Sequence, residues 1–353
     1  MGETLLLTIP VLFLMATSIA PVEPPAPSRQ PQLAAAHGLV AMTFGSGSSI
    51  YFTSSADQGL TWKAPVKVAD STTLALGRHR GPRVAILKHS IVITAVVGGK
   101  GTKQADTLAA FRSQDLGKTW ARGGVINDVP ESAREGLHAM SAAPDGSLFA
   151  VWLDLRAKGT QLYGAKSTDG GATWSKNVQV YASPDGTICQ CCHPTLSIDA
   201  NGGIHAMWRN VIDGSRDFYV ASSSDGVHFA PARKLGEGTW KLDACPMDGG
   251  GLAIEDGKAI SAWRRESDIF LVEGSSERRI GPGKDVALAR SGKHETYLAW
   301  TKDGGVEILT PKSAQPFTLS KAGGFATLVT LADGGVLAAW ETHDSIDVQR
   351  LDR

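Results

Sequence analysis

Residues 55–62 read Ser-Ala-Asp-Gln-Gly-Leu-Thr-Trp, and the same order of residue types returns twice further along the chain. Residues 113–120 read Ser-Gln-Asp-Leu-Gly-Lys-Thr-Trp, and residues 167–174 read Ser-Thr-Asp-Gly-Gly-Ala-Thr-Trp. A shortened copy occupies residues 223–229, and the aromatic ends of the four copies are 58, 54 and 55 residues apart. Such regular spacing is typical of a repeat architecture.

The residue types within each copy suit a tight turn. Ser and Asp side chains bond to nearby backbone amides, Gly adopts a positive φ, and Trp packs into the layer beneath. The pattern Ser-x-Asp-x-Gly-x-Thr-Trp resembles the Asp-box, also called the BNR repeat, of the sialidase-type β-propellers. In that family the turns lie between outer strands, away from the active face. The resemblance therefore implies a structural role, not a catalytic one, for Asp57, Asp115 and Asp169.

A second repeated element is an apolar stretch that ends in Trp and follows a hairpin turn such as Asp145-Gly146. The stretches end at Trp152, Trp208, Trp263, Trp300 and Trp340. Weaker units around Phe44 and Val97 bring the number of copies to seven, each expected to hold four short strands.

We therefore predict an all-β chain with a single β-propeller over residues 32–353. Seven blades are favoured, with the six blades of catalytic sialidases as the alternative. The last unit lacks an obvious fourth strand, and residues before Gln32 are the candidates to supply it and close the ring.

The composition describes an ordinary globular domain. The chain has 353 residues, 42% of them hydrophobic, and its 35 basic residues balance 35 acidic ones. Nucleic-acid grooves and anchors to acidic membranes need surplus Lys and Arg, so neither is expected here. Intrinsic disorder is excluded by the same balance of apolar and charged residues.

The first residues predict an exported protein. The run from Leu5 to Ala20 is apolar and ends in the small residues Ser18-Ile19-Ala20, which is typical of a secretory signal peptide over residues 1–20. A membrane anchor or a buried first strand is the alternative. Residues 21–31 are rich in proline and predict an extended linker. The mature protein is then expected in the periplasm or outside the cell, without a stable membrane anchor.

Propeller geometry also predicts where a site lies. A segment that leaves the outer strand of one blade and enters the inner strand of the next emerges beside the central channel on one face. We call these the crossover segments and their shared end of the channel the channel mouth. Most chemically capable residues fall in crossover segments 77–83, 134–140, 189–194, 243–248 and 283–285.

All four cysteines lie in two neighbouring crossover segments. Thiols, imidazoles and a thioether form a soft set of donors that suits copper, with zinc as the alternative. The predicted metal ligands are Cys189, Cys191, Cys192, His193, Cys245, His138 and Met247. A competing interpretation has disulfides between Cys189 and Cys192 and between Cys191 and Cys245, and a redox-active pair is a further alternative.

The resemblance to sialidases implies a different function, in which three arginines bind a sugar carboxylate and a Tyr, a Glu and an Asp perform hydrolysis. The chain has no Arg-Ile-Pro before its first box, and no Tyr matches the nucleophile. The nearest analogue, residues 80–83, follows the first box instead. The candidate residues for binding or processing an anionic glycan are Arg78, Arg80, Arg83 and Glu135. A third hypothesis is a non-catalytic interaction scaffold stapled by disulfides.

Overall fold

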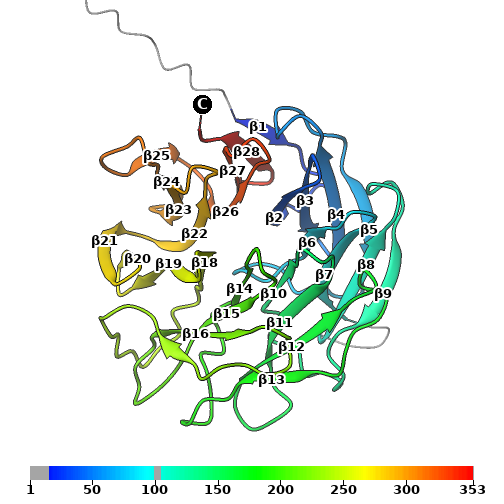
Figure 1. The fold of residues 1–353 in the computed structure, drawn as a ribbon. Coiled ribbons are helices and arrows are strands. Elements are labelled where there is room, and N and C mark those ends of the chain that lie inside the picture. Colours follow the sequence, from blue (N-terminus) through cyan, green and yellow to red (C-terminus); the bar gives the residue numbers. More distant parts are fainter. Residues whose placement is uncertain (1–15, 99–104, 353) are drawn as a thin grey trace, which may run out of the picture.

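The computed structural model describes residues 16–98 and 105–352, which form seven four-stranded antiparallel sheets arranged around a central axis (Figure 1). This arrangement confirms the predicted seven-bladed propeller. Across these described ranges, no helix has the length and apolar character needed to cross a membrane.

The first four blades follow the chain from their inner to their outer strands. They comprise β2 (Ser28–Ala36), β3 (Leu39–Ser46), β4 (Ser49–Ser55) and β5 (Val66–Asp70); β6 (Arg83–Ile86), β7 (Ile91–Val97), β8 (Thr107–Ser113) and β9 (Ala121–Val125); β10 (His138–Ala142), β11 (Leu148–Asp154), β12 (Gln161–Ser167) and β13 (Val178–Tyr181); and β14 (Thr195–Ile198), β15 (Ile204–Arg209), β16 (Phe218–Ser223) and β17 (Arg233–Lys234).

Blades five and six are built in the same way, whereas the seventh combines the two ends of the described chain. These blades comprise β18 (Gly250–Glu255), β19 (Lys258–Arg265), β20 (Asp268–Glu273) and β21 (Ser276–Pro282); β22 (Lys284–Arg290), β23 (Thr296–Lys302), β24 (Gly305–Leu309) and β25 (Phe317–Ser320); and β26 (Gly324–Thr330), β27 (Val336–Glu341), β28 (Ile346–Arg350) and β1 (Thr17–Ile19).

Strand β1 closes the ring as the fourth strand of the last blade. It runs antiparallel to β28, with Thr17 opposite Val348 and Ile19 opposite Ile346, and the two strands lie side by side in Figure 1. This confirms that residues before Gln32 supply the missing strand. The ring is thus held by backbone hydrogen bonds between segments more than three hundred residues apart along the chain.

The propeller begins earlier than the sequence suggested. Residues 1–15, most of the expected signal peptide, lie outside the described residues, but Thr17–Ile19 belong to a blade. Strand β2 starts at Ser28, inside the stretch expected to be a linker. Glu23 also bonds to the first blade, accepting from the Tyr51 hydroxyl at 2.6 Å and pairing with Lys67 at 2.6 Å. Removal of residues 1–20 would therefore remove the strand that closes the ring.

The Asp-boxes are turns between the third and fourth strands of their blades, as predicted. In the first box the Ser55 hydroxyl donates to Asp57 at 2.7 Å and accepts from the Gly59 amide at 2.8 Å. Asp57 accepts from the Thr61 amide at 2.9 Å, and these hydrogen bonds with Thr61 and Ser55 lower the pKa of Asp57 to about 2. The Asp115 and Asp169 boxes repeat the pattern. The carboxylates are thus occupied by the turn itself.

Each Asp-box also packs against the preceding blade. Gly59, at φ +87°, faces Leu337 of the seventh blade, and Gly117, at φ +84°, faces the ring of Phe52 in the first blade. The hydrophobic core lies in these interfaces between blades, with one cluster joining Phe44 in the first blade to Leu337 in the seventh. The Trp residues that end the second strands are buried among the same layers.

We expect Gly117→Ala to destabilise the propeller more than Gly146→Ala. Gly146 has a positive φ of 83° but nothing within 4 Å of an added Cβ, so its substitution carries only backbone strain, about 1–2 kcal/mol. A Cβ on Gly117 would also overlap Phe52, which adds about 1–3 kcal/mol of overpacking. Urea unfolding of the two variants measures the difference, and equal losses would show that the box glycine is not required for contact between blades.

Candidate functional site

Inner strands of three blades carry the same irregularity at the channel mouth. The pairing of the first strand with the second shifts register between Arg29 and Gln32 in the first blade, and equivalent shifts occur in the sixth and seventh blades. A non-glycine residue in left-handed conformation lies in each irregular stretch: Gln30 at φ 56°, Asp285 at φ 57° and Phe325 at φ 52°. Such residues are uncommon and gather at functional sites.

These three residues, together with His79, were missed by sequence reasoning as individual candidates. A signal for Gln30, Asp285 and Phe325, which His79 does not share, exists in the sequence. Gln30, His193, Asp285 and Phe325 each stand three residues before a leucine on an inner strand, and these leucines are Leu33, Leu196, Leu288 and Leu328. The repeated offset places a different residue at the mouth in each of these four blades, three positions before a recurring leucine.

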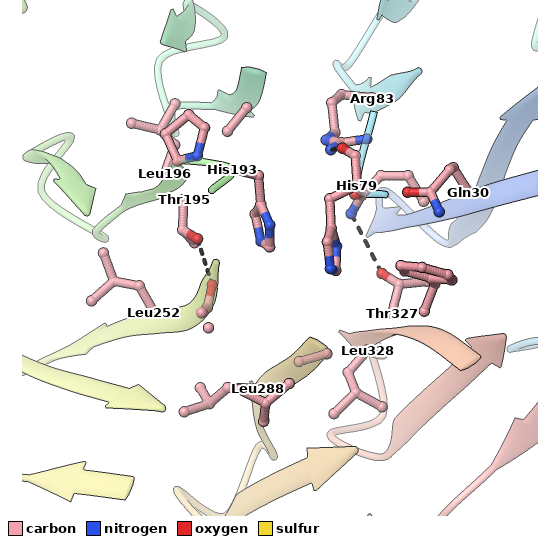
Figure 2. Close-up of a pocket in the computed structure, with 18 of the residues that line it drawn as sticks. Gln30, His79, Arg83, His193, Thr195, Leu196, Leu252, Leu288, Thr327 and Leu328 are labelled. Atoms are coloured by element: carbon pink, nitrogen blue, oxygen red, sulfur yellow. Dashed lines mark hydrogen bonds between the residues drawn. The ribbon is translucent and has the colours of Figure 1, made fainter. Parts of the chain in front are cut away.

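The channel mouth contains a cavity of about 200 Å³ whose lining includes the facing side chains of His79 and His193 (Figure 2). The rings of His79 and His193 are stacked, with centroids 4.2 Å apart. His79 Nε2 lies 2.8 Å from Asp285 Oδ1, so an ion pair or hydrogen bond joins crossover segment 77–83 to the sixth blade. The Gly249 amide donates to His193 Nδ1 at 3.1 Å, which leaves Nε2 as the protonated nitrogen of the neutral ring. The rest of the cavity is lined by a mixture of polar and apolar residues, four leucines among them.

Arg83 is a half-buried cation on this cavity. Its guanidinium donates only to backbone carbonyls, those of His79 at 2.6 Å and of Gly81 and Pro82 at 3.1 Å. Burial lowers the pKa of Arg83 to about 10, and no carboxylate of the described residues forms an ion pair with it. A partly desolvated charge without an opposite charge nearby makes this end of the cavity receptive to an anion.

Asp248 holds the other side of the mouth together. Its carboxylate lies 3.4 Å from Arg209 and 2.9 Å from Arg264. Burial raises the pKa of Asp248, although the two guanidinium groups act in the opposite direction. Because Asp248 is only 1% exposed, its role is to anchor the crossover segment 243–248 against the fourth and fifth blades.

Three of the four cysteines form a buried cluster, which we call the thiol cluster: Cys189, Cys191 and Cys192. Their Sγ atoms all lie within 4.8 Å of one another, with Cys189 3.6 Å from Cys191 and 3.3 Å from Cys192. All four cysteines of the chain are free thiols. Hydrogen bonds with Cys191 and Cys192 lower the pKa of Cys189, and Arg216 donates to the same sulfur at 3.3 Å. The sulfur of Cys189 therefore lies beside a cation that favours its thiolate form.

The predicted metal ligands divide into two groups. Met247 packs against the thiol cluster, while its Sδ accepts from Arg78 at 3.3 Å. Cys245 is exposed and lies two residues before Met247 in the same crossover segment. The two histidines face elsewhere, since His193 stacks on His79 and the fully buried His138 bonds through Nε2 to Thr94 Oγ1 at 3.1 Å. Neither imidazole belongs to the group of ligand atoms that converge in the described part of the chain.

The residues predicted to bind an anionic glycan are also separated. Only Arg83 lines the cavity at the channel mouth. Arg80 donates through Nε to the Glu135 carbonyl at 2.6 Å and lies 3.7 Å from the Glu135 carboxylate, whereas Arg78 extends to Met247. Burial raises the pKa of Glu135 in spite of the nearby Arg80. A cluster of three arginines is thus not formed by these residues.

The sequence is similar to a known family of repeats. Residues 33–187 match the family described as BNR repeat-like domain, in agreement with the resemblance drawn from the Asp-boxes. Among curated proteins, none matches the sequence.

Solved structures similar to this one include carbohydrate-active propellers. An α-L-arabinanase of Penicillium chrysogenum, solved with arabinobiose, has a TM-score of 0.59 at 15% identity, and the alignment covers 96% of this chain and 98% of that one. An intramolecular trans-sialidase of Ruminococcus gnavus, solved with oseltamivir carboxylate, has a TM-score of 0.54 at 12% identity over 92% and 94% of the chains. A Dyadobacter fermentans protein of unknown function has a TM-score of 0.58 at 13% identity over 96% and 99%. At these identities the likeness shows the fold alone.

We expect His138 to make the stability of the propeller depend on pH. Burial lowers the pKa of His138 to about 3, whereas an unfolded histidine titrates near ~6.5. The unfolded chain therefore binds a proton that the folded chain excludes. The contribution of His138 is complete above about pH 6.5 and is lost toward pH 3, at about 1.4 kcal/mol per pH unit.

Urea unfolding between pH 7 and pH 4.5 measures how steeply the free energy of unfolding changes with pH. His138→Gln should flatten this slope, while His89→Gln, a substitution of an exposed histidine, controls for general effects of removing an imidazole. An unchanged slope in His138→Gln would contradict the assignment.

Proposed function

We propose that this chain, a seven-bladed propeller whose residues 33–187 are similar to the BNR repeat-like domain, is an exported protein that binds one soft metal ion, Cu(I), in the thiol cluster. The observation that carries the proposal is the convergence of three buried sulfur atoms, Cys189, Cys191 and Cys192, within 4.8 Å of one another. Export and copper are both parts of the proposal, and zinc is the alternative metal. Because β1 closes the ring, export must leave Thr17–Ile19 in the mature chain.

The spacing of the sulfurs suits one shared ion. A metal–thiolate bond of about 2.3 Å places the sulfurs of a trigonal or tetrahedral site about 3.8–4.0 Å apart. The Cys189 sulfur, at 3.6 Å and 3.3 Å from its two partners, needs to move by only a few tenths of an ångström. Three thiols held this close in a buried site also repel one another once ionised, so a bound cation relieves the cluster.

The surroundings favour an ion bound by thiolates. Arg216 donates to Cys189 at 3.3 Å, and the positive charge of Arg209 helps to lower the pKa of the same thiol. These two guanidinium groups offset the negative charge that remains when one monovalent ion meets three thiolates. The positive charges beside Cys189 therefore favour loss of the thiol proton, which metal binding requires.

Copper fits the donor set better than zinc. Structural zinc sites complete a tetrahedron with a fourth thiolate or an imidazole, and the nearest histidine, His193, is turned toward His79. The remaining neighbour is Met247, whose thioether is a soft, uncharged donor of the kind that selects Cu(I). A bound metal also protects thiols from oxidation outside the cytoplasm.

We expect protein purified anaerobically without chelators to bind about one Cu(I) per chain. Elemental analysis gives the metal content, and titration with a thiol reagent gives the number of protected cysteines. Cys189→Ser and Cys192→Ser should abolish binding, whereas Cys245→Ser should retain it. Zinc in place of copper would change the identity of the metal, and absence of metal together with full thiol reactivity in metal-supplemented protein would overturn the proposal.

A second candidate function is binding of an anionic glycan at the channel mouth. The observation that favours it is Arg83, a half-buried guanidinium without a carboxylate partner in the described residues, on a cavity that also presents His193. The similar structures solved with arabinobiose and oseltamivir carboxylate bind their ligands on the same fold. A sugar carboxylate would supply the missing negative charge.

For this candidate we expect sialyllactose to bind and lactose, which lacks the carboxylate, not to bind. Arg83→Ala should weaken sialyllactose binding about tenfold or more, and Arg83→Lys, which keeps the charge, should recover part of it. Isothermal titration measures the affinities, and thermal melting confirms that the variants fold. Equal affinity in wild type and Arg83→Ala would exclude Arg83 as the anion-binding residue.

A further inference from the structure

The loop of residues 241–248, which we call the cover loop, contacts the thiol cluster at several points. Arg216 connects the loop to the cluster. Its Nε donates to the Leu242 carbonyl at 2.9 Å, and its Nη1 donates to Cys189 Sγ at 3.3 Å. Met247, at φ 63°, packs its side chain against the cysteines. Two sulfur-containing residues of the cover loop, Cys245 and Met247, thus stand beside the three buried thiols.

The four cysteines differ in their exposure to solvent, which increases from the thiol cluster to Cys245. Cys189 and Cys192 are each 1% exposed, Cys191 is 8% exposed, and Cys245 is classed as exposed. Cys245 lies in the cover loop between Leu242, whose carbonyl accepts from Arg216, and Met247, which packs against the cluster. The least buried member of the cluster, Cys191, is the one most accessible to exchange with this surface cysteine.

The cover loop is positioned firmly where it approaches the cluster. Arg264 donates to the Pro246 carbonyl at 2.7 Å and pairs with Asp248 at 2.9 Å. These contacts fix the residues on either side of Met247, whereas Cys245 itself extends to solvent. The arrangement gives an external molecule access to one sulfur while three remain covered.

From this arrangement we infer that Cys245 is the exchange thiol of the metal site: it passes Cu(I) between the thiol cluster and an external partner that presents a thiolate. The inference rests on the proposed metal-binding function. It separates three resident ligands, Cys189, Cys191 and Cys192, from a fourth cysteine that holds the metal only in transit.

The exchange needs no oxidant or reductant. The Cu–Sγ bond to Cys191 breaks as a Cu–Sγ bond to Cys245 forms, and the proton released by Cys245 is taken up by Cys191. Thiolates of the external partner then bind the ion one after another, and the Cu–Sγ bonds to Cys189, Cys192 and finally Cys245 break; the protons released by the partner thiols are taken up by these three sulfurs. Copper stays in the +1 state throughout. An accessible sulfur is required because thiolate exchange proceeds by attack of an incoming sulfur on the site.

The test uses the full chain loaded with Cu(I). Glutathione is added as the external thiol, and bicinchoninate reports the copper released by its colour. We expect glutathione to accelerate release from the wild type, and Cys245→Ser to lower this glutathione-dependent rate about tenfold while the copper content stays the same. Ala244→Ser, which adds a hydroxyl to the neighbouring residue of the cover loop, serves as the matched control and should release copper at the wild-type rate.

The outcomes distinguish the two proposals. Equal glutathione-dependent rates for wild type and Cys245→Ser would overturn the role of Cys245 and leave the metal site standing. Loss of copper from Cys245→Ser at equilibrium would also overturn it, by making Cys245 a resident ligand. Failure of the wild type to bind Cu(I) at all would remove the proposed function and this inference with it.

Discussion

The antiparallel pairing of β1 with β28 is the constraint on which the site depends. Each crossover segment belongs to a different blade, so the segments meet only when the ring is closed. The stack of His79 on His193 joins the crossover segments that enter the second and fourth blades. The hydrogen bond or ion pair from His79 to Asp285 reaches the sixth blade. These contacts span the channel and would be lost if the first and last blades separated.

Within each repeat, the Asp-box holds the blade against its neighbour, whereas the channel mouth carries residues that differ between blades. On the outer strands the same few side chains recur in box after box, because each must make the same turn and seat a glycine on the preceding blade. At the mouth the corresponding positions differ from blade to blade, with an amide in Gln30, a carboxylate in Asp285 and a ring in Phe325. Left-handed backbone at these residues is supported by the rigid sheets around them.

Two kinds of chemistry lie side by side at this face, since Cys192 of the thiol cluster directly precedes His193 of the cavity. The thiol cluster has sulfur donors and nearby guanidinium groups, which suit a soft cation bound by thiolates. The cavity has a half-buried guanidinium without a carboxylate partner among the described residues, which suits an anion. The different charge requirements explain why the predicted metal ligands and glycan-binding residues sort into separate places.

The sequence by itself determined the propeller, the seven blades, the turns at the Asp-boxes and the crossover segments that carry the chemistry, because local turn residues and strand periodicity repeat at a fixed spacing. Only the tertiary structure decided which of these residues meet. It brought Cys189, Cys191 and Cys192 together, placed His138 against Thr94, and used Thr17–Ile19 as a strand. The reason is physical: the direction of a side chain at the end of an inner strand depends on bulges and on packing between blades, which no local pattern encodes.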